Sequence, residues 1–222
     1  MILGALLAAG TGARFGDGTE SRSDDRNKLL ADLDGKPVVT RAARTLTESS
    51  LDAAVAVVGH DREAVERALP DGIETVANPD YGRGQSASVR RAVAVARERG
   101  ADAAVFALGD MPCVEVATVE AILREYRDGR GDDVHDSRGG TPGIVAPRHE
   151  GRRGNPVLFD ARYFDELDRV EGDAGGRALL ESDPVTWVEV ADPGVHRDVD
   201  TERDLRDLRR RQSESASRSG RE

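Results

Sequence analysis

Hydrophobic runs alternate with amphipathic stretches along most of this chain. The runs at residues 2–9, 53–58 and 103–108 carry no charged residue, which is typical of strands buried on both faces of a parallel sheet. Shorter strands are expected at residues 73–76, 143–146 and 185–190. Apolar spacings of three and four predict helices at residues 37–46, 61–69, 84–99, 116–126 and after 201. The alternation predicts a single α/β domain with three layers, a Rossmann-like arrangement around a mostly parallel mixed sheet.

The first hydrophobic run ends in a glycine-rich loop. Gly10, Gly12 and Gly16 surround Arg14, and Lys28 follows beyond the loop. Glycines allow backbone N–H groups to approach an anion without a Cβ in the way. The loop therefore suggests a phosphate cradle, with one or two cations directed into it.

Three simpler interpretations compete for this loop. A dinucleotide-binding fingerprint needs a helix directly after the glycines and an acidic residue about 20 positions further on. Here residues 17–26 are polar and acidic, and no second hydrophobic strand follows at that distance. A Walker A loop is excluded because Gly35-Lys36 precedes Pro37 rather than Ser or Thr. The third interpretation is an ordinary glycine-rich turn.

Aspartates near the ends of two extended segments are candidate metal ligands. Asp110 lies just after a buried strand, where a carboxylate can hold Mg²⁺ with one or two protein ligands, since phosphates and water complete the shell. Asp198 and Asp200 alternate along an extended segment and therefore point the same way. The structural alternatives are a turn at Asp110 and a capping box formed by Thr201 and Asp204.

A loop after the third predicted strand is a candidate ligand-binding segment. It contains Asn78 and Gly84 and leads through Ser86 and Ser88 into a helix. The first turn of a helix offers N–H groups without partners in the helix, and these can bind a ligand. The structural alternative is an ordinary helix start capped by serine.

Composition restricts the class of partner. The chain has 222 residues with 32 Lys and Arg against 42 Asp and Glu, so its net charge is −10. This acidity argues against nucleic acid as partner, but a nucleotide site needs only a few cations. Lys28 and Lys36 are its two lysines, and the excess of arginine and acid is typical of GC-rich codons and a salty, halophile-like cytoplasm.

Other features describe the setting of the protein. A single cysteine, Cys113, rules out a disulfide framework within the chain. No hydrophobic run approaches 18 residues and no signal-like segment is visible, so we expect a cytoplasmic protein without membrane contact. Residues 1–210 are expected to form the domain, and residues 211–222 a disordered tail.

Taken in order, several strings resemble the molybdenum cofactor cytidylyltransferases, an NTP-transferase family related to molybdopterin guanylyltransferase. They are LAAGTGARFG, NKLL, DGKPVV, LGDMP, GRRGNPVLF, GDAGGRALL and DVDTERDL, and together they span residue 2 to about 208. The resemblance implies a nucleotidyltransferase fold. It also implies an enzyme that uses Mg²⁺ to transfer CMP from CTP to the terminal phosphate of molybdenum cofactor and releases pyrophosphate.

The resemblance also implies roles for individual residues. The catalytic group would be Arg14, Lys28 and Asp110, and the metal ligands Asp110, Asp198 and Asp200. The acceptor would meet Arg152, Arg153, Asn155 and Gly175. The nucleotide would meet Leu7, Ala8, Ala9, Gly10, Gly12, Arg14, Lys28, Asn78, Gly84, Ser86 and Ser88.

Alternatives to this function remain open. LAAG rather than LAGG favours cytidine, by resemblance, over GTP or another nucleotide used on molybdopterin or on a phosphorylated small metabolite. A protein of another class would be a non-catalytic nucleotide-binding chaperone with a molybdenum enzyme as client, against which Lys28 and Asp110 argue. An NAD-dependent oxidoreductase is disfavoured because the acidic residue that binds ribose is absent from its expected place.

Overall fold

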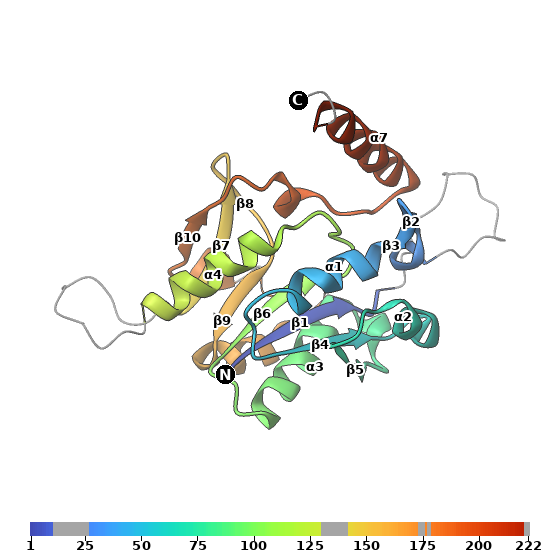
Figure 1. The fold of residues 1–222 in the computed structure, drawn as a ribbon. Coiled ribbons are helices and arrows are strands. Elements are labelled where there is room, and N and C mark those ends of the chain that lie inside the picture. Colours follow the sequence, from blue (N-terminus) through green and yellow to red (C-terminus); the bar gives the residue numbers. More distant parts are fainter. Residues whose placement is uncertain (11–26, 130–141, 173–175, 177–178, 220–222) are drawn as a thin grey trace.

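One twisted sheet with helices on both sides organises the protein, as the computed structural model shows (Figure 1). The structure describes residues 1–10, 27–129, 142–172, 176 and 179–219, and side chains up to residue 211. The strands are β1 (Ile2–Ala8), β4 (Ala53–Val58), β5 (Glu74–Ala77), β6 (Ala103–Leu108), β7 (Ile144–His149), β8 (Arg152–Arg153), β9 (Val157–Asp160) and β10 (Thr186–Glu189). A separate small hairpin joins β2 (Asp32–Leu33) to β3 (Lys36–Pro37).

Seven α-helices are found in the described part of the chain. They are α1 (Val38–Thr47), α2 (Arg62–Ala68), α3 (Gln85–Glu98), α4 (Val116–Asp128), α5 (Phe164–Asp168), α6 (Leu179–Ser182) and α7 (Glu202–Ser219). Short 3₁₀ turns accompany them at η1 (Lys28–Leu30), η2 (Tyr81–Arg83), η3 (Ala161–Tyr163) and η4 (Pro193–His196). None of the described helices is long and apolar enough to cross a bilayer.

The sheet is mixed and mostly parallel, as predicted. Its order is β10-β7-β9-β6-β1-β4-β5, with β8 added beside β7. The pairs β6–β1, β1–β4, β4–β5 and β7–β10 are parallel, whereas β9 is antiparallel to both β6 and β7. Parallel neighbours bring the carboxyl ends of β1, β4 and β6 to one edge, which is where open α/β sheets bind ligands.

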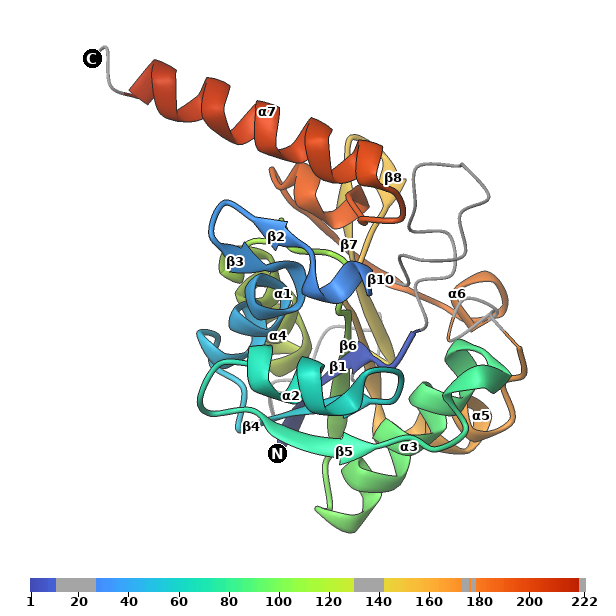
Figure 2. The same cartoon turned by 90° about the vertical axis from the view of Figure 1, so that its right-hand side faces the viewer.

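Alternate residues of the strands build two cores, one on each face of the sheet. In β1, Leu6 packs with residues of α1 and α4, while Leu3 packs with residues of α3 and α5. Figure 2 shows α1 and α4 on one side of the strands and α3 and α5 on the other. Burial on both faces explains why these strands consist of uninterrupted apolar residues, since each buried Leu or Val adds about 1.5–3 kcal/mol.

The C-terminal segment contains a helix that crosses the expected boundary at residue 210. Helix α7 continues to Ser219 and extends away from the rest of the protein (Figures 1 and 2). Its first turns are anchored because Leu205 and Leu208 are buried against Leu33, Val38 and Val199. The expected boundary at residue 210 therefore falls within a helix.

Candidate active site

A lysine and two aspartates meet at the carboxyl edge of the sheet. Lys28 Nζ lies 2.6 Å from Asp110 Oδ2 and 2.7 Å from Asp200 Oδ1. The three residues come from η1, from the loop after β6 and from the segment before α7. The structure thus brings Lys28 together with two residues that follow it by 82 and 172 positions in the sequence.

Local structure holds Lys28 in this place. The side chain of Asn27 accepts a hydrogen bond from Leu29 N at 3.0 Å and so caps the single turn of η1. Leu29 is buried in the core beneath the turn. With its neighbour anchored, Lys28 projects toward the carboxylates rather than away into solvent.

The charge of Lys28 is stabilised by its partners. Burial alone would lower its pKa, but the negative charge of Asp110 and hydrogen bonds to Asp110 and Asp200 outweigh that effect, so the pKa is raised. Only 13% of the side chain is exposed to solvent. At neutral pH the site therefore contains a fixed positive charge between two carboxylates.

Asp198 has the opposite electrostatic character. Loss of hydration raises the pKa of its carboxyl group, and the negative charges of Asp200 and Asp110 raise it further. A backbone hydrogen bond and the charge of Lys28 oppose this rise without cancelling it. Ionised Asp198 would consequently be stabilised by an additional cation nearby.

The three aspartates do not form a ready three-ligand metal centre. Within the described ranges, no group of three His, Cys, Asp or Glu side chains is arranged to hold a metal ion. Asp110 and Asp200 nevertheless both reach one cation, the ammonium group of Lys28. Two carboxylates directed at one positive charge fit Mg²⁺, which takes one or two protein carboxylates and completes its shell with phosphate oxygens and water.

A cavity of about 380 Å³ lies beside this cluster. Its polar lining includes Arg152, Arg153, Asn155, Asp198, Gln85 and His196. Its apolar lining includes Leu7, Val89, Phe106, Leu108, Met111, Val157, Phe159 and Val195. The structure thus brings three of the expected acceptor residues, Arg152, Arg153 and Asn155, to one cavity with an expected metal ligand.

The expected nucleotide residues after β5 do not line this cavity. Asn78 Nδ2 donates to Ser88 Oγ at 3.0 Å, and both residues are buried, so this pair ties the end of β5 to α3. Gly84 has a φ of 94°, which favours glycine at the start of that helix. Ser86 Oγ is buried without a hydrogen-bond partner in the described part of the chain.

The expected residues of the glycine-rich loop are placed only in part. Leu7 lines the cavity, Ala8 and Ala9 are buried, and Gly10 is exposed. Gly12, Arg14 and Gly175 lie outside the described residues.

Some cavity residues were not among the sequence candidates. His196 and Met111 lie within two residues of Asp198 and Asp110, so proximity to a motif was the available signal. Gln85 sits between Gly84 and Ser86, both candidates. Phe106 and Val157 gave no signal, because an apolar residue of a core strand looks the same in the sequence whether it faces a helix or a cavity.

The comparison with protein families identifies this arrangement. Residues 4–187 match the model of the MobA-like NTP transferase domain, and this range includes most of β1, Lys28, Asp110 and the Arg152–Arg153 strand. The chain belongs to this family. The match confirms the predicted family and the predicted activity class, so the protein is a nucleotidyltransferase.

Two curated relatives cover nearly the whole of this MobA-like chain. Nicotine blue oxidoreductase from Paenarthrobacter nicotinovorans is 31% identical over 204 residues, which are 90% of this chain and 92% of the relative. The purine catabolism protein PucB from Bacillus subtilis is 25% identical and covers 96% of this chain and 98% of its own.

Solved structures confirm the fold. Rv0371c from Mycobacterium tuberculosis is similar with a TM-score of 0.72 and 29% identity, covering 94% of this chain and 97% of the other. Another structure of Rv0371c, with a TM-score of 0.70 and 27% identity, is a complex with manganese and covers 93% of this chain and 97% of that one. A nucleotidyl transferase from Methanothermobacter has a TM-score of 0.75 at 22% identity, covers 97% of this chain and 99% of its own, and shows the fold alone.

Proposed function

We propose that this nucleotidyltransferase transfers CMP from CTP to the terminal phosphate of a molybdopterin-type acceptor. An oxygen of the acceptor phosphate attacks the α-phosphorus of CTP. The bond from that phosphorus to the oxygen leading to the β-phosphate breaks, and pyrophosphate leaves. The observation that carries the proposal is the Lys28, Asp110 and Asp200 cluster beside a cavity that contains two arginines.

The charged residues divide the work of binding. Arg14 and Lys28 are proposed to hold the triphosphate, with Lys28 moving from the carboxylates onto phosphate oxygens. Asp110, with Asp198 or Asp200, would hold Mg²⁺. Support comes from the two carboxylates that share one cation here and from the manganese complex of the relative Rv0371c. When bound, the metal supplies charge neutralisation at the phosphates.

The protein needs no covalent nucleophile for this reaction. Transfer between phosphates depends mainly on alignment of the attacking oxygen and on neutralisation of charge. The apolar side of the cavity, formed by residues such as Phe106, Met111 and Val157, fits a flat ring system. Arg152, Arg153 and Asn155 on its polar side would orient the acceptor, with Gly175 as a further proposed contact.

The nucleotide is proposed to lie along the carboxyl edge of the sheet. Leu7, Ala8, Ala9, Gly10 and Gly12 would surround the base and the phosphates. Asn78, Gly84, Ser86 and Ser88 would form the more distant part of this surface, where the buried Ser86 hydroxyl is a candidate hydrogen-bond donor. The choice of CTP rests on the LAAG string, and GTP is the main alternative within the same chemistry.

The decisive experiment measures pyrophosphate release with Mg²⁺ and each of CTP, GTP, ATP and UTP, with and without molybdenum cofactor. We expect pyrophosphate release only in the mixture that contains both CTP and molybdenum cofactor. The Asp110→Asn variant should release none. Release with another nucleotide would retain the chemistry and replace CTP. Tight nucleotide binding without release in any mixture would favour a chaperone that serves a molybdenum enzyme.

One relative supports a second arm of the same assay. The 31% identical relative is named an oxidoreductase, so oxidation of NADH and NADPH should be followed in parallel with a chromogenic acceptor. We expect no oxidation above the background without enzyme. Saturable oxidation of either cofactor, without pyrophosphate release from any triphosphate, would contradict the proposed function.

A further inference from the structure

Two chain segments carry the candidate metal ligands, and they run side by side. One contains Asp110 and continues to the start of α4 at Val116. The other begins at Asp192 and contains Asp198 and Asp200. Val199 N donates to Asp110 O at 2.9 Å, which joins the segments at the metal-binding end. Their opposite end is held by a buried carboxylate, Asp192.

Asp192 bonds to both segments. Its Oδ2 accepts hydrogen bonds from Glu115 N and from Thr118 Oγ1, each at 2.8 Å, so it caps α4 from 77 residues away. Glu115, the residue in the capping position, makes no side-chain capping bond itself. Asp192 Oδ1 accepts from Gly194 N at 2.7 Å, which shapes the turn into η4. Only 3% of Asp192 is exposed, so these bonds are shielded from water.

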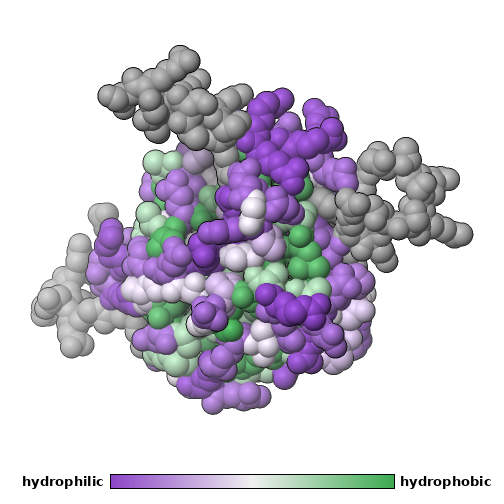
Figure 3. Space-filling view, turned by 45° about the vertical axis from the view of Figure 1, so that its right-hand side comes forward, coloured by the Kyte–Doolittle hydropathy of each residue, from purple (hydrophilic) through white to green (hydrophobic). Residues whose placement is uncertain are grey.

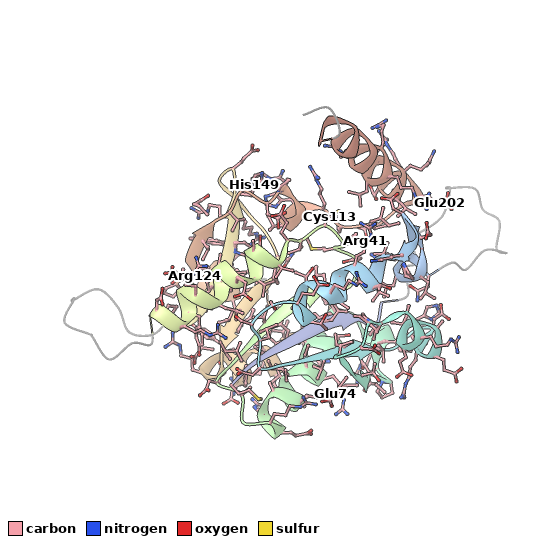
Figure 4. All side chains as sticks on the ribbon, viewed as in Figure 1. Arg41, Glu74, Cys113, Arg124, His149 and Glu202 are labelled. Carbon is pink, nitrogen blue, oxygen red and sulfur yellow. The ribbon has the colours of Figure 1, made fainter. Side chains whose placement is uncertain are left out.

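The segments also touch through their backbones between these two ends. A Cβ added to Gly194 would lie 1.9 Å from Cys113 O, so no other residue fits here unless the two segments move apart. Figure 4 places Cys113 beside the chain that leads toward α7. The contacts pair residue 110 with 199, 113 with 194 and 115 with 192, so the segments run antiparallel, and the segment that contains η4 has two extra residues between the first two contacts. Because side chains alternate along an extended segment, a slip of one residue at 198–200 would turn Asp198 and Asp200 away from Asp110 and Lys28.

We propose that Asp192 is a positioning residue for nucleotidyl transfer: it sets the register that brings Asp198 and Asp200 opposite Asp110. This inference rests on the proposed function, in which these carboxylates hold the metal. Asp192 touches neither substrate nor metal in this scheme. It acts through the backbone of the two segments, as residues that orient metal ligands do.

The test compares Asp192→Asn with Tyr126→Phe. Asparagine keeps the shape of the side chain, and its oxygen can still accept the hydrogen bond from Gly194 N. Its NH₂ group would face Glu115 N–H, and because both groups are donors, the bond that caps α4 would be lost. Tyr126→Phe removes a hydroxyl group that donates to Asp160 Oδ2 at 2.7 Å and to Asp102 O at 3.2 Å, in the same helix α4 and outside the site. It therefore controls for a loss of stability in α4 without a change of register.

Manganese affinity is the main readout. Binding of Mn²⁺ to the protein with CTP is followed by electron paramagnetic resonance, and kcat, KM and Tm are measured on the same samples. For Asp192→Asn we expect Mn²⁺ affinity and kcat to fall by about 10–100-fold. Tyr126→Phe should lower Tm and leave both values unchanged. Gly194→Ala should act in the same direction as Asp192→Asn, because it pushes the segments apart.

Two results would overturn the inference, and they are distinguishable. If Asp192→Asn loses thermal stability as Tyr126→Phe does but keeps wild-type Mn²⁺ affinity and kcat, Asp192 serves stability alone. If the wild-type protein neither binds Mn²⁺ with CTP nor releases pyrophosphate, the proposed function fails and the inference fails with it.

Discussion

At the scale of single residues, the position of Lys28 has a consequence for metal binding. Its ammonium group lies within 2.7 Å of both Asp110 and Asp200, the carboxylates that are proposed to hold a divalent cation. The protein without nucleotide therefore neutralises its own carboxylates. We expect a triphosphate to draw Lys28 away, so that metal and nucleotide bind together and the metal alone binds weakly.

Lys28→Met tests this exchange. We expect the variant to bind Mn²⁺ more tightly than wild type when no nucleotide is present, because two carboxylates lose their internal cation. Its kcat/KM should fall by about 10²-fold or more, since the charge that is proposed to hold the triphosphate is removed. Lys36→Met is the matched control, because Lys36 is the other lysine of the chain and lies exposed in β3. Equal Mn²⁺ affinity in Lys28→Met and wild type would contradict the exchange.

Asp198 leads to a prediction about pH. Because its pKa is raised above 3.8 in the folded protein, its contribution to stability is present below that value and is lost as pH rises through the folded pKa. Asp198→Asn should therefore raise Tm at pH 7.5, and this gain should shrink as pH falls toward 4.5. The side chain is partly exposed, so the gain will be small. Pyrophosphate release should drop at least 10-fold. Thermal melts across this pH range, beside Asp71→Asn as an exposed-surface control, measure the effect.

At the scale of elements, the start of α7 connects stability with the site. Asp204 Oδ2 accepts from Thr201 N at 2.7 Å, and Asp204 N donates to Thr201 Oγ1 at 3.2 Å, which is the predicted capping box. The same carboxylate accepts from Asp200 N at 3.2 Å. The cap therefore also orients the residue that pairs with Lys28.

Asp204→Ala should lower the free energy of unfolding by about 1 kcal/mol, which is about 2–4 °C in Tm for a chain of this size. Burial opposes ionisation of Asp204, but hydrogen bonds from Thr201 and from the backbone of Asp200 outweigh it and lower its pKa below 3.8. The stabilisation is thus present above pH 3.8 and is lost as pH falls through the lower folded pKa. Urea unfolding at pH 7 measures the loss. A Tm equal to wild type at neutral pH would show that the cap is dispensable.

The same elements show what the sequence could predict. Strands β4 and β6 match their predicted residues because burial on both faces leaves an unmistakable apolar run. Strand β9 has only four residues and runs antiparallel, so no periodicity marked it. Asp110 was recognisable because it follows such a run. The role of Asp192 was not, because its partners Glu115 and Thr118 lie more than 70 residues away and only the fold brings them close.

At the scale of the whole molecule, excess negative charge is the dominant feature. Acidic residues outnumber basic ones by 42 to 32. On the face shown in Figure 3, hydrophilic residues cover much of the surface, and hydrophobic residues form small separate patches. Many of the ion pairs are exposed, such as Arg97 with Asp165 at 2.5 Å, and exposed pairs add little stability. Repulsion among the unpaired carboxylates should therefore outweigh them.

Salt should consequently stabilise this protein. Raising NaCl from 0.02 M to 0.5 M shortens the screening length to well under 10 Å, so long-range repulsion weakens while buried contacts are unaffected. We expect a gain on the order of 1 kcal/mol, or about 2–4 °C in Tm. Most of the rise should occur below about 0.3 M, because screening saturates, whereas exclusion of salt from the surface would continue to act at higher concentration. Melts in NaCl and in LiCl at matched ionic strength separate the two effects. A fall in Tm as NaCl is raised would mean that the exposed ion pairs stabilise the protein more than charge repulsion destabilises it.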